Sequence, residues 1–190
     1  MLSNISNTDD GAESVNLPFV FIWRGLVNYT QVEVHSNGAV FPGGDRSNAY
    51  SYGAFPVKLG IGYSVPRIAA WQQDLNPSIA GNIYGANVDG VFVISWEGVP
   101  QHGGLPENGV NFQVALHPGG NIEIRWGDGN PPTNAYSGAS GIEDDAAGMA
   151  VPVTRFPFGD ETYGAGVSGT FPSNQCRIFL VSAAMGNYTE

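Results

Sequence analysis

Acidic and amide side chains in turn-rich segments are the residues of this chain with the clearest capacity for chemistry. Carboxylate, amide and backbone oxygens are the ligands that a hard cation such as Ca²⁺ prefers, and loops commonly supply them. These segments lack the twelve-residue calcium-loop pattern, and Asp and Asn also favour turns without a metal. We therefore assign no metal ligand outright and expect no cofactor, with one structural calcium as the alternative. The calcium candidates are Asp74, Asn76, Asp89, Glu143 and Asp144, with Asp9 and Asp10 as a further acidic pair.

Glu97 is the best candidate for a catalytic acid. Glycoside hydrolysis needs two carboxyl groups on either side of the scissile bond. Glu97 follows Trp96 at the end of an apolar run, where the ring could shield it from water, and Asp74 or Glu143 could be its partner. A strand-end carboxylate bonded to turn amides is the simpler explanation of Glu97. We expect that the chain is not an enzyme.

The histidines and the single cysteine show no metal-ligand spacing. His35, His102 and His117 lie in three separate segments, whereas zinc sites need clustered ligands. We expect surface histidines, with His35 and His117 on the outward faces of their strands. Cys176 lies in an apolar run, and we expect it to be a buried thiol that packs as a small hydrophobic residue.

Four tyrosines are the candidates for contact with a ligand. They lie in turn-rich segments among Asn, Ser and Gly, a composition typical of adaptable binding loops and suited to stacking on sugar rings. Burial under a neighbouring loop is an equally consistent interpretation. The four are Tyr50, Tyr52, Tyr63 and Tyr84.

The charge of the chain restricts its partners. The formal net charge is −10, and Lys58 is the only lysine beside six scattered arginines. Nucleic acids and anionic membranes attract clustered basic residues, so we expect neither as a partner. No apolar run approaches the roughly 20 residues that span a bilayer. A protein or glycan ligand, a cation or further copies of the chain remain as partners.

Two hairpins can be recognised in the sequence. Residues 31–35 alternate polar and apolar side chains, Asn37-Gly38 is a dipeptide that tolerates the positive φ angles of a tight turn, and residues 39–41 form the return strand. Residues 111–117 and 121–126 alternate in the same way around Pro118-Gly119-Gly120. Period-two alternation broken by such turns predicts antiparallel strands.

Further apolar runs indicate more strands. Residues 18–23, 91–96 and 177–182 are strand candidates, and the last two are apolar on both faces, as in strands covered on both sides. Residues 65–71 are a weak helix or turn candidate, because Pro66 could occupy a first helical turn. The segments 42–64 and 127–175 are long and rich in turn residues.

Together these elements predict one all-β domain over residues 1–190. The chain is 42% hydrophobic, with 27 Gly and 13 Pro, a balance typical of a folded chain with many turns. We expect an antiparallel, jelly-roll-like β-sandwich, with a β-barrel as the alternative. Residues 1–8 are expected to be a flexible lead-in and residues 184–190 a tail.

A series of short motifs in a fixed order resembles a known family. The series includes Asp-Asp-Gly at 9–11, Val-Glu-Val-His-Ser-Asn-Gly at 32–38 and the Trp-containing motif at 67–77, followed by the segments 91–99, 112–122 and 141–144. This order resembles the nidogen-like extracellular module of plexin-domain-containing and bacterial surface proteins. The resemblance implies a β-sandwich used for adhesion or ligand binding, with no catalytic residues to transfer. Related sequences tend to carry an acidic pair where this chain has Gln72-Gln73-Asp74, so a cation role there is weakened.

The expected function is therefore recognition outside the cell. We expect an extracellular, cell-surface or virion-surface module that binds a protein or glycan without catalysis. A structural subunit of a virion, phage or filament is the alternative, and a glycan-active hydrolase is the third. The N-terminus lacks the features of a signal peptide, so a secreted form would have lost its leader or been cut from a longer chain.

Overall fold

A computed structural model describes residues 2, 5–44, 66–129, 139–143, 154–155, 174–182 and 187–189. No helix among them is long and apolar enough to cross a membrane. The elements are β1 (Ala12–Trp23), β2 (Val27–His35), β3 (Ala39–Pro42), β4 (Arg67–Gln72), β5 (Asn82–Val88), β6 (Val91–Val99), the 3-10 helix η1 (Pro106–Asn108), β7 (Val110–Leu116), β8 (Ile122–Gly129), β9 (Ala139–Glu143), β10 (Thr154–Arg155), β11 (Gln175–Ser182) and β12 (Asn187–Thr189).

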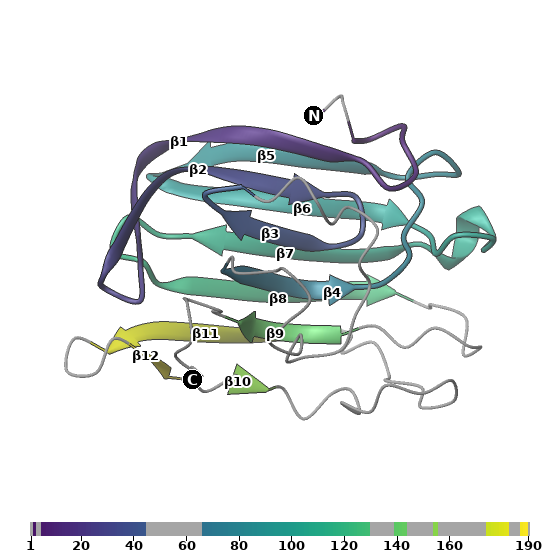
Figure 1. Ribbon diagram of the computed structural model, residues 1–190. Coiled ribbons are helices and arrows are strands. Elements are labelled where there is room, and N and C mark those ends of the chain that lie inside the picture. The colour runs from purple at the N-terminus through teal and green to yellow at the C-terminus, as the bar shows by residue number, and fades with distance from the viewer. Residues whose placement is uncertain are drawn as a thin grey trace, which may run out of the picture.

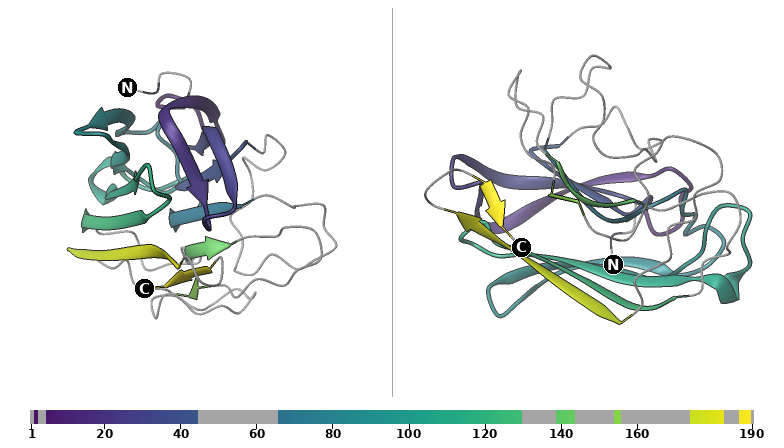
Figure 2. Two further views of the ribbon diagram at one scale, coloured as in Figure 1. Left: turned by 90° about the vertical axis from the view of Figure 1, so that its left-hand side faces the viewer. Right: turned by 90° about the horizontal axis from the view of Figure 1, so that it is seen from below.

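The strands form two antiparallel sheets packed face to face (Figures 1 and 2). The first sheet has the order β1-β2-β3-β4-β9-β10, and the second has the order β12-β11-β8-β7-β6-β5. Strands that follow each other along the chain are mostly neighbours, so each sheet is built around a four-strand meander. The described strands do not close into a barrel, and the expected antiparallel β-sandwich is confirmed.

The first predicted hairpin is present. Val34 of β2 pairs with Val40 of β3, and Gly38 between them has a φ of +81°. A Cβ on Gly38 would collide with the carbonyl oxygen of Trp71. This position therefore requires glycine both for its backbone conformation and for its close approach to β4.

The second predicted hairpin, β7 and β8, is confirmed with its faces as expected. Alternate side chains point into the sandwich, where their exposed fractions do not exceed 2%. The turn closes through a hydrogen bond from the Gly120 N–H to the His117 carbonyl, and Gly120 has a φ of +90°. The inward-facing residues are Phe112, Val114, Leu116, Ile122, Ile124 and Trp126.

Residues 67–72 form strand β4, so the weak helix or turn prediction for 65–71 is wrong. β4 pairs with β3 on one side and with β9 on the other, and all six of its residues are buried. A strand inside a sheet that is covered on both faces shows no polar alternation. Pro66 lies just before the strand, where it removes no ladder hydrogen bond.

The core lies between the two sheets and includes the N-terminal segment. Leu2 and Ile5 are buried in the same cluster as Trp96 and Phe112, and the Leu2 N–H donates to the Ile83 carbonyl. The description of residues 1–8 as a flexible lead-in therefore does not fit these two residues. Part of the expected tail, Asn187–Thr189, pairs with β11 as strand β12.

The outer face of the second sheet is more exposed than its apolar sequence indicates. Val93 of the central strand β6 is half-buried. Ile178 of β11 is 48% exposed, and Cys176 is an exposed free thiol. Cys176 and β11 were expected to be covered, and this expectation is wrong because β11 turns these side chains away from the first sheet.

The prediction for His35 was wrong in the opposite direction, because this residue was expected to be exposed and is buried. It is 1% exposed. Its Nε2 lies 3.0 Å from Oε1 of the equally buried Glu33, and its ring centroid lies 4.5 Å from that of Phe41. The carboxylate partner offsets the cost of burying the imidazole. His117 is half-exposed, with Nε2 3.9 Å from Oε2 of Glu123.

Candidate metal centre

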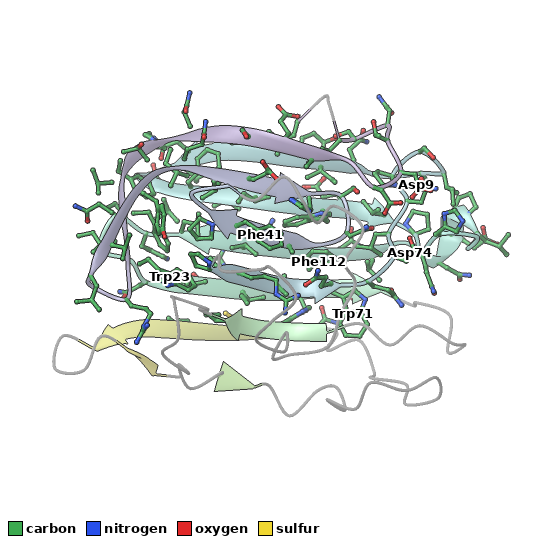
Figure 3. The ribbon with its side chains drawn as sticks, viewed as in Figure 1. Asp9, Trp23, Phe41, Trp71, Asp74 and Phe112 are labelled. Carbon is green, nitrogen blue, oxygen red and sulfur yellow. The ribbon has the colours of Figure 1, made fainter. Side chains whose placement is uncertain are left out.

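One end of the sandwich brings together loops from both sheets (Figure 3). The N-terminal segment before β1, the β2–β3 turn, the β4–β5 connection and the connection from β6 to η1 meet there. Asp9 and Asp74, labelled in Figure 3, lie at this end. We call it the loop end.

Asn37 of the predicted Asn-Gly turn holds two of these segments in place. Its side chain is 1% exposed. Nδ2 donates to Asp10 Oδ1 at 2.7 Å, and Oδ1 accepts the Leu75 N–H at 2.8 Å. One buried amide therefore connects the N-terminal segment to the segment after β4.

A short backbone ladder sets Asp74 opposite His102. Leu75 and Gln101 form an isolated antiparallel bridge, and the His102 N–H donates to the Asp74 carbonyl at 2.7 Å. Residues opposite each other in an antiparallel pair direct their side chains to the same face. The side chains of Asp74 and His102 consequently share one side of this ladder.

Asp9 completes the cluster. Asp9, Asp74 and His102 each offer one ligand atom, and these atoms lie within 4.8 Å of one another. This is the one group of at least three His, Cys, Asp or Glu side chains with such spacing in the part of the chain that the structure describes. Asp9 and Asp74 are half-buried and His102 is exposed, so solvent reaches the cluster from one side.

The His102 ring faces two groups that require opposite protonation states of its Nδ1. Its Nδ1 lies 2.9 Å from Asp9 Oδ2 and 3.4 Å from Asn76 Nδ2. Asn76 Oδ1 accepts both the N–H and the hydroxyl of Ser78, which fixes its Nδ2 as the donor that faces His102. A carboxylate oxygen requires a proton or a cation on Nδ1, whereas the amide N–H requires the Nδ1 lone pair.

The carboxylate of Asp9 has one unused oxygen. Its Oδ1 is inaccessible to solvent and has no hydrogen-bond partner among the described residues. Buried polar atoms are normally satisfied, so each exception requires an explanation. The orphan oxygen lies on the same carboxylate that approaches His102.

The structure brings together only part of the candidate set chosen from sequence. Asp74 and its neighbour Asn76 lie at the cluster. Asp89 occupies the exposed β5–β6 turn at the opposite end of the sandwich, and Glu143 belongs to β9, in register with Arg67. Asp144 lies outside the described residues.

Only one of the four tyrosine candidates lies among the described residues. Tyr84 is half-buried within strand β5, and its assignment to a turn-rich segment is therefore wrong. Tyr50, Tyr52 and Tyr63 lie outside the described residues.

Sequence reasoning missed His102 as a partner of the acidic residues. It lies 93 residues from Asp9, and no spacing rule joins them. The available signals were the Asp-Asp-Gly motif and the position of His102 just after a strand. Neither could show that the two segments meet.

A second polar group lies on the outer face of the second sheet. Arg125 Nε and Nη2 each donate to the Glu123 carboxylate at 2.7 Å, and these bonds lower the pKa of Glu123. Cys176 Sγ lies 3.2 Å from Glu123 Oε1. Partial burial, followed by this carboxylate, raises the pKa of the thiol above its ordinary value, which disfavours a reactive thiolate.

Comparison with known proteins identifies the family. Neither the curated proteins nor the solved structures contain a match to this chain. A family model described as NIDO related matches residues 1–165. This stretch includes the loop end, with Asp9, Asp74 and His102, and the family is typically extracellular. Because the match covers most of the chain, the protein belongs to the nidogen-related family.

Proposed function

We propose that this chain is an extracellular recognition module that binds a protein or glycan ligand without catalysing a reaction. The observation that carries the proposal is the family match over residues 1–165. Display on a cell or virion surface is the location that agrees with this family match. The sandwich supports such a role, because binding residues commonly lie on loops held by a rigid scaffold.

The loop end is the proposed contact surface. Its loops come from both sheets, and the buried Asn37 amide holds two of the segments there. Exposed polar groups include His102 and Glu107 of η1. The net charge of −10 favours ligands with basic groups.

The surroundings of Glu97 support the non-catalytic assignment. Glu97 is exposed, and its Oε1 accepts a hydrogen bond from Ser95 Oγ at 3.0 Å. Its first candidate partner, Asp74, is grouped instead with Asp9 and His102. An exposed carboxylate bonded to a neighbour on its own strand is a common feature of sheet surfaces.

A binding screen tests the proposal. The purified chain is screened against glycans and extracellular matrix proteins, with calcium or with EDTA, and we expect saturable binding of at least one ligand without turnover. Glu107→Gln at the loop end should weaken that binding about threefold, mainly through the association rate. Asp89→Asn, the matched change at the opposite end, should leave it unchanged. Glycan turnover that disappears in Glu97→Gln would establish the hydrolase instead.

The structural-subunit alternative has one observation in its favour. Leu26 at the β1–β2 turn is 71% exposed, and Val88 at the β5–β6 turn is 52% exposed. Exposed apolar groups at one end of the sandwich could pack against another copy. Sedimentation of the purified chain separates the two functions: a recognition module stays monomeric. A subunit forms ordered assemblies that Leu26→Ser weakens and Leu105→Ser, at the loop end, does not.

A further inference from the structure

We infer that Asp9, Asp74 and His102 bind one divalent cation of the first transition series, with Zn²⁺ as the test ion. The ion would join the N-terminal segment to the connections that follow β4 and β6. The inference is independent of the recognition function, because it concerns how the loop end is held together.

The donor set distinguishes among cations. Imidazole nitrogen is a ligand for Zn²⁺ and its neighbours, whereas Ca²⁺ and Mg²⁺ prefer oxygen alone. One His nitrogen and two carboxylates are ligand types that Zn²⁺ accepts. The structural calcium considered as an alternative from the sequence was based on acidic and amide residues alone and did not include His102.

The spacing of the donors lets them converge on one ion. The three ligand atoms lie within 4.8 Å of one another. Adjacent ligands of a tetrahedral zinc ion with bonds of about 2.1 Å lie about 3.4 Å apart. Asp9 Oδ2 and His102 Nδ1 are 2.9 Å apart, so an ion between them needs only a small separation of the two side chains.

An unsatisfied oxygen at the loop end also agrees with an ion. Asp9 Oδ1 is a buried oxygen with no hydrogen-bond partner among the described residues, and a cation could use it together with, or in place of, Oδ2. Its carboxylate lies against His102 Nδ1, and a cation bound between them takes the place of a proton on that nitrogen.

Such an ion would connect segments that are far apart in the sequence. Asp9 lies between the buried Ile5 and the start of β1, Asp74 follows β4, and His102 follows β6. β4 and β6 belong to different sheets. Metal binding should therefore stabilise the packing of the N-terminal segment against both.

Isothermal titration of the EDTA-treated and dialysed chain with Zn²⁺, Mn²⁺ and Ca²⁺, each separately, provides the test. We expect one equivalent of Zn²⁺ to bind, and the melting temperature to rise by about 5–10 °C at a hundredfold excess over Kd. Asp9→Asn and His102→Gln should each weaken Zn²⁺ binding at least about tenfold. The matched changes Asp89→Asn and His117→Gln, away from the cluster, should not alter it.

Several outcomes would overturn the inference. The site is excluded if none of the three ions binds saturably, or if Zn²⁺ binds equally well to wild type and His102→Gln. Calcium binding that is lost in Asp9→Asn but retained in His102→Gln would exclude a transition-metal ion.

Amide hydrogen exchange of the wild-type chain gives a second measurement, which requires no variant to fold. Zn²⁺ should slow exchange in residues 5–11 and leave the β5–β6 turn unaffected. Unchanged exchange in residues 5–11 overturns the inference, because an ion bound through Asp9 must hold this segment.

Discussion

At one end of the sandwich the β1–β2 and β5–β6 connections are tight turns, whereas at the loop end the chain crosses between sheets through longer connections. The tight turns use consecutive positive φ angles, at Arg24 and Gly25 and at Asp89 and Gly90. The loop end depends on tertiary contacts, above all the buried Asn37 amide. The difference shows that local conformation is sufficient for the β1–β2 and β5–β6 turns, whereas the loop end also needs a buried polar side chain that bonds to distant segments.

Glycine substitutions should show this difference most strongly. Gly38→Ala places a Cβ against the Trp71 carbonyl oxygen at a φ of +81°, and we expect a loss of about 3 kcal/mol or more in unfolding free energy. Gly90→Ala, at a φ of +84° with no atom within 4 Å of the added Cβ, should lose only about 1 kcal/mol. Urea unfolding measures both. Equal losses would contradict the proposed contrast between the two ends.

Removal of the Asn37 side chain should have the next largest effect. Asn37→Ala leaves the Leu75 N–H without its side-chain acceptor and Asp10 without its donor, which should destabilise the fold by about 2 kcal/mol. The exposed Asn28, near the start of β2, provides the control, and Asn28→Ala should change stability by less than about 0.5 kcal/mol. Thermal and urea unfolding of both variants give the comparison. A neutral Asn37→Ala would mean that the loop end is held mainly by its backbone.

Glu123 should have the smallest effect, since it belongs to neither end. Its hydrogen bonds with Arg125 lower its pKa from the ordinary 4.5, so its stabilising contribution is present above that value and is lost as pH falls through the lowered pKa. Glu123→Gln should therefore cost less than about 1 kcal/mol near pH 7, and the stabilities of wild type and variant should converge as the pH falls below the lowered pKa. Urea unfolding across this pH range measures the difference. A difference in unfolding free energy between wild type and variant that widens at low pH would contradict the lowered pKa of Glu123.

Several elements of the fold were predictable because their causes are local. Alternation in residues 31–35 and 111–117, broken by Asn-Gly and Pro-Gly-Gly, predicted hairpins that the structure contains. The Asp89-Gly90 dipeptide carries the same type of turn signal, but Asp89 was weighed as a calcium ligand. The strand β4 was missed because it is buried on both faces and therefore shows no alternation.

The candidate site was predictable only in part. Asp74 and Asn76 were selected because acidic and amide groups in turns can bind cations. His35 and Cys176 were misplaced in opposite directions, since an alternating pattern shows which residues share a face but not whether another layer covers that face. The pairing of Asp9 with His102 crosses 93 residues, a separation that local patterns do not encode.

The sequence by itself determined the two hairpins with their turns and the family, because these depend on side-chain alternation, permitted φ angles and motif order. Tertiary structure alone decided which polar groups meet. It placed Asp9, Asp74 and His102 within 4.8 Å of one another and buried Glu33 with His35. The physical reason is that burial and proximity arise when two sheets pack, and each residue then acquires neighbours from segments far away in the chain.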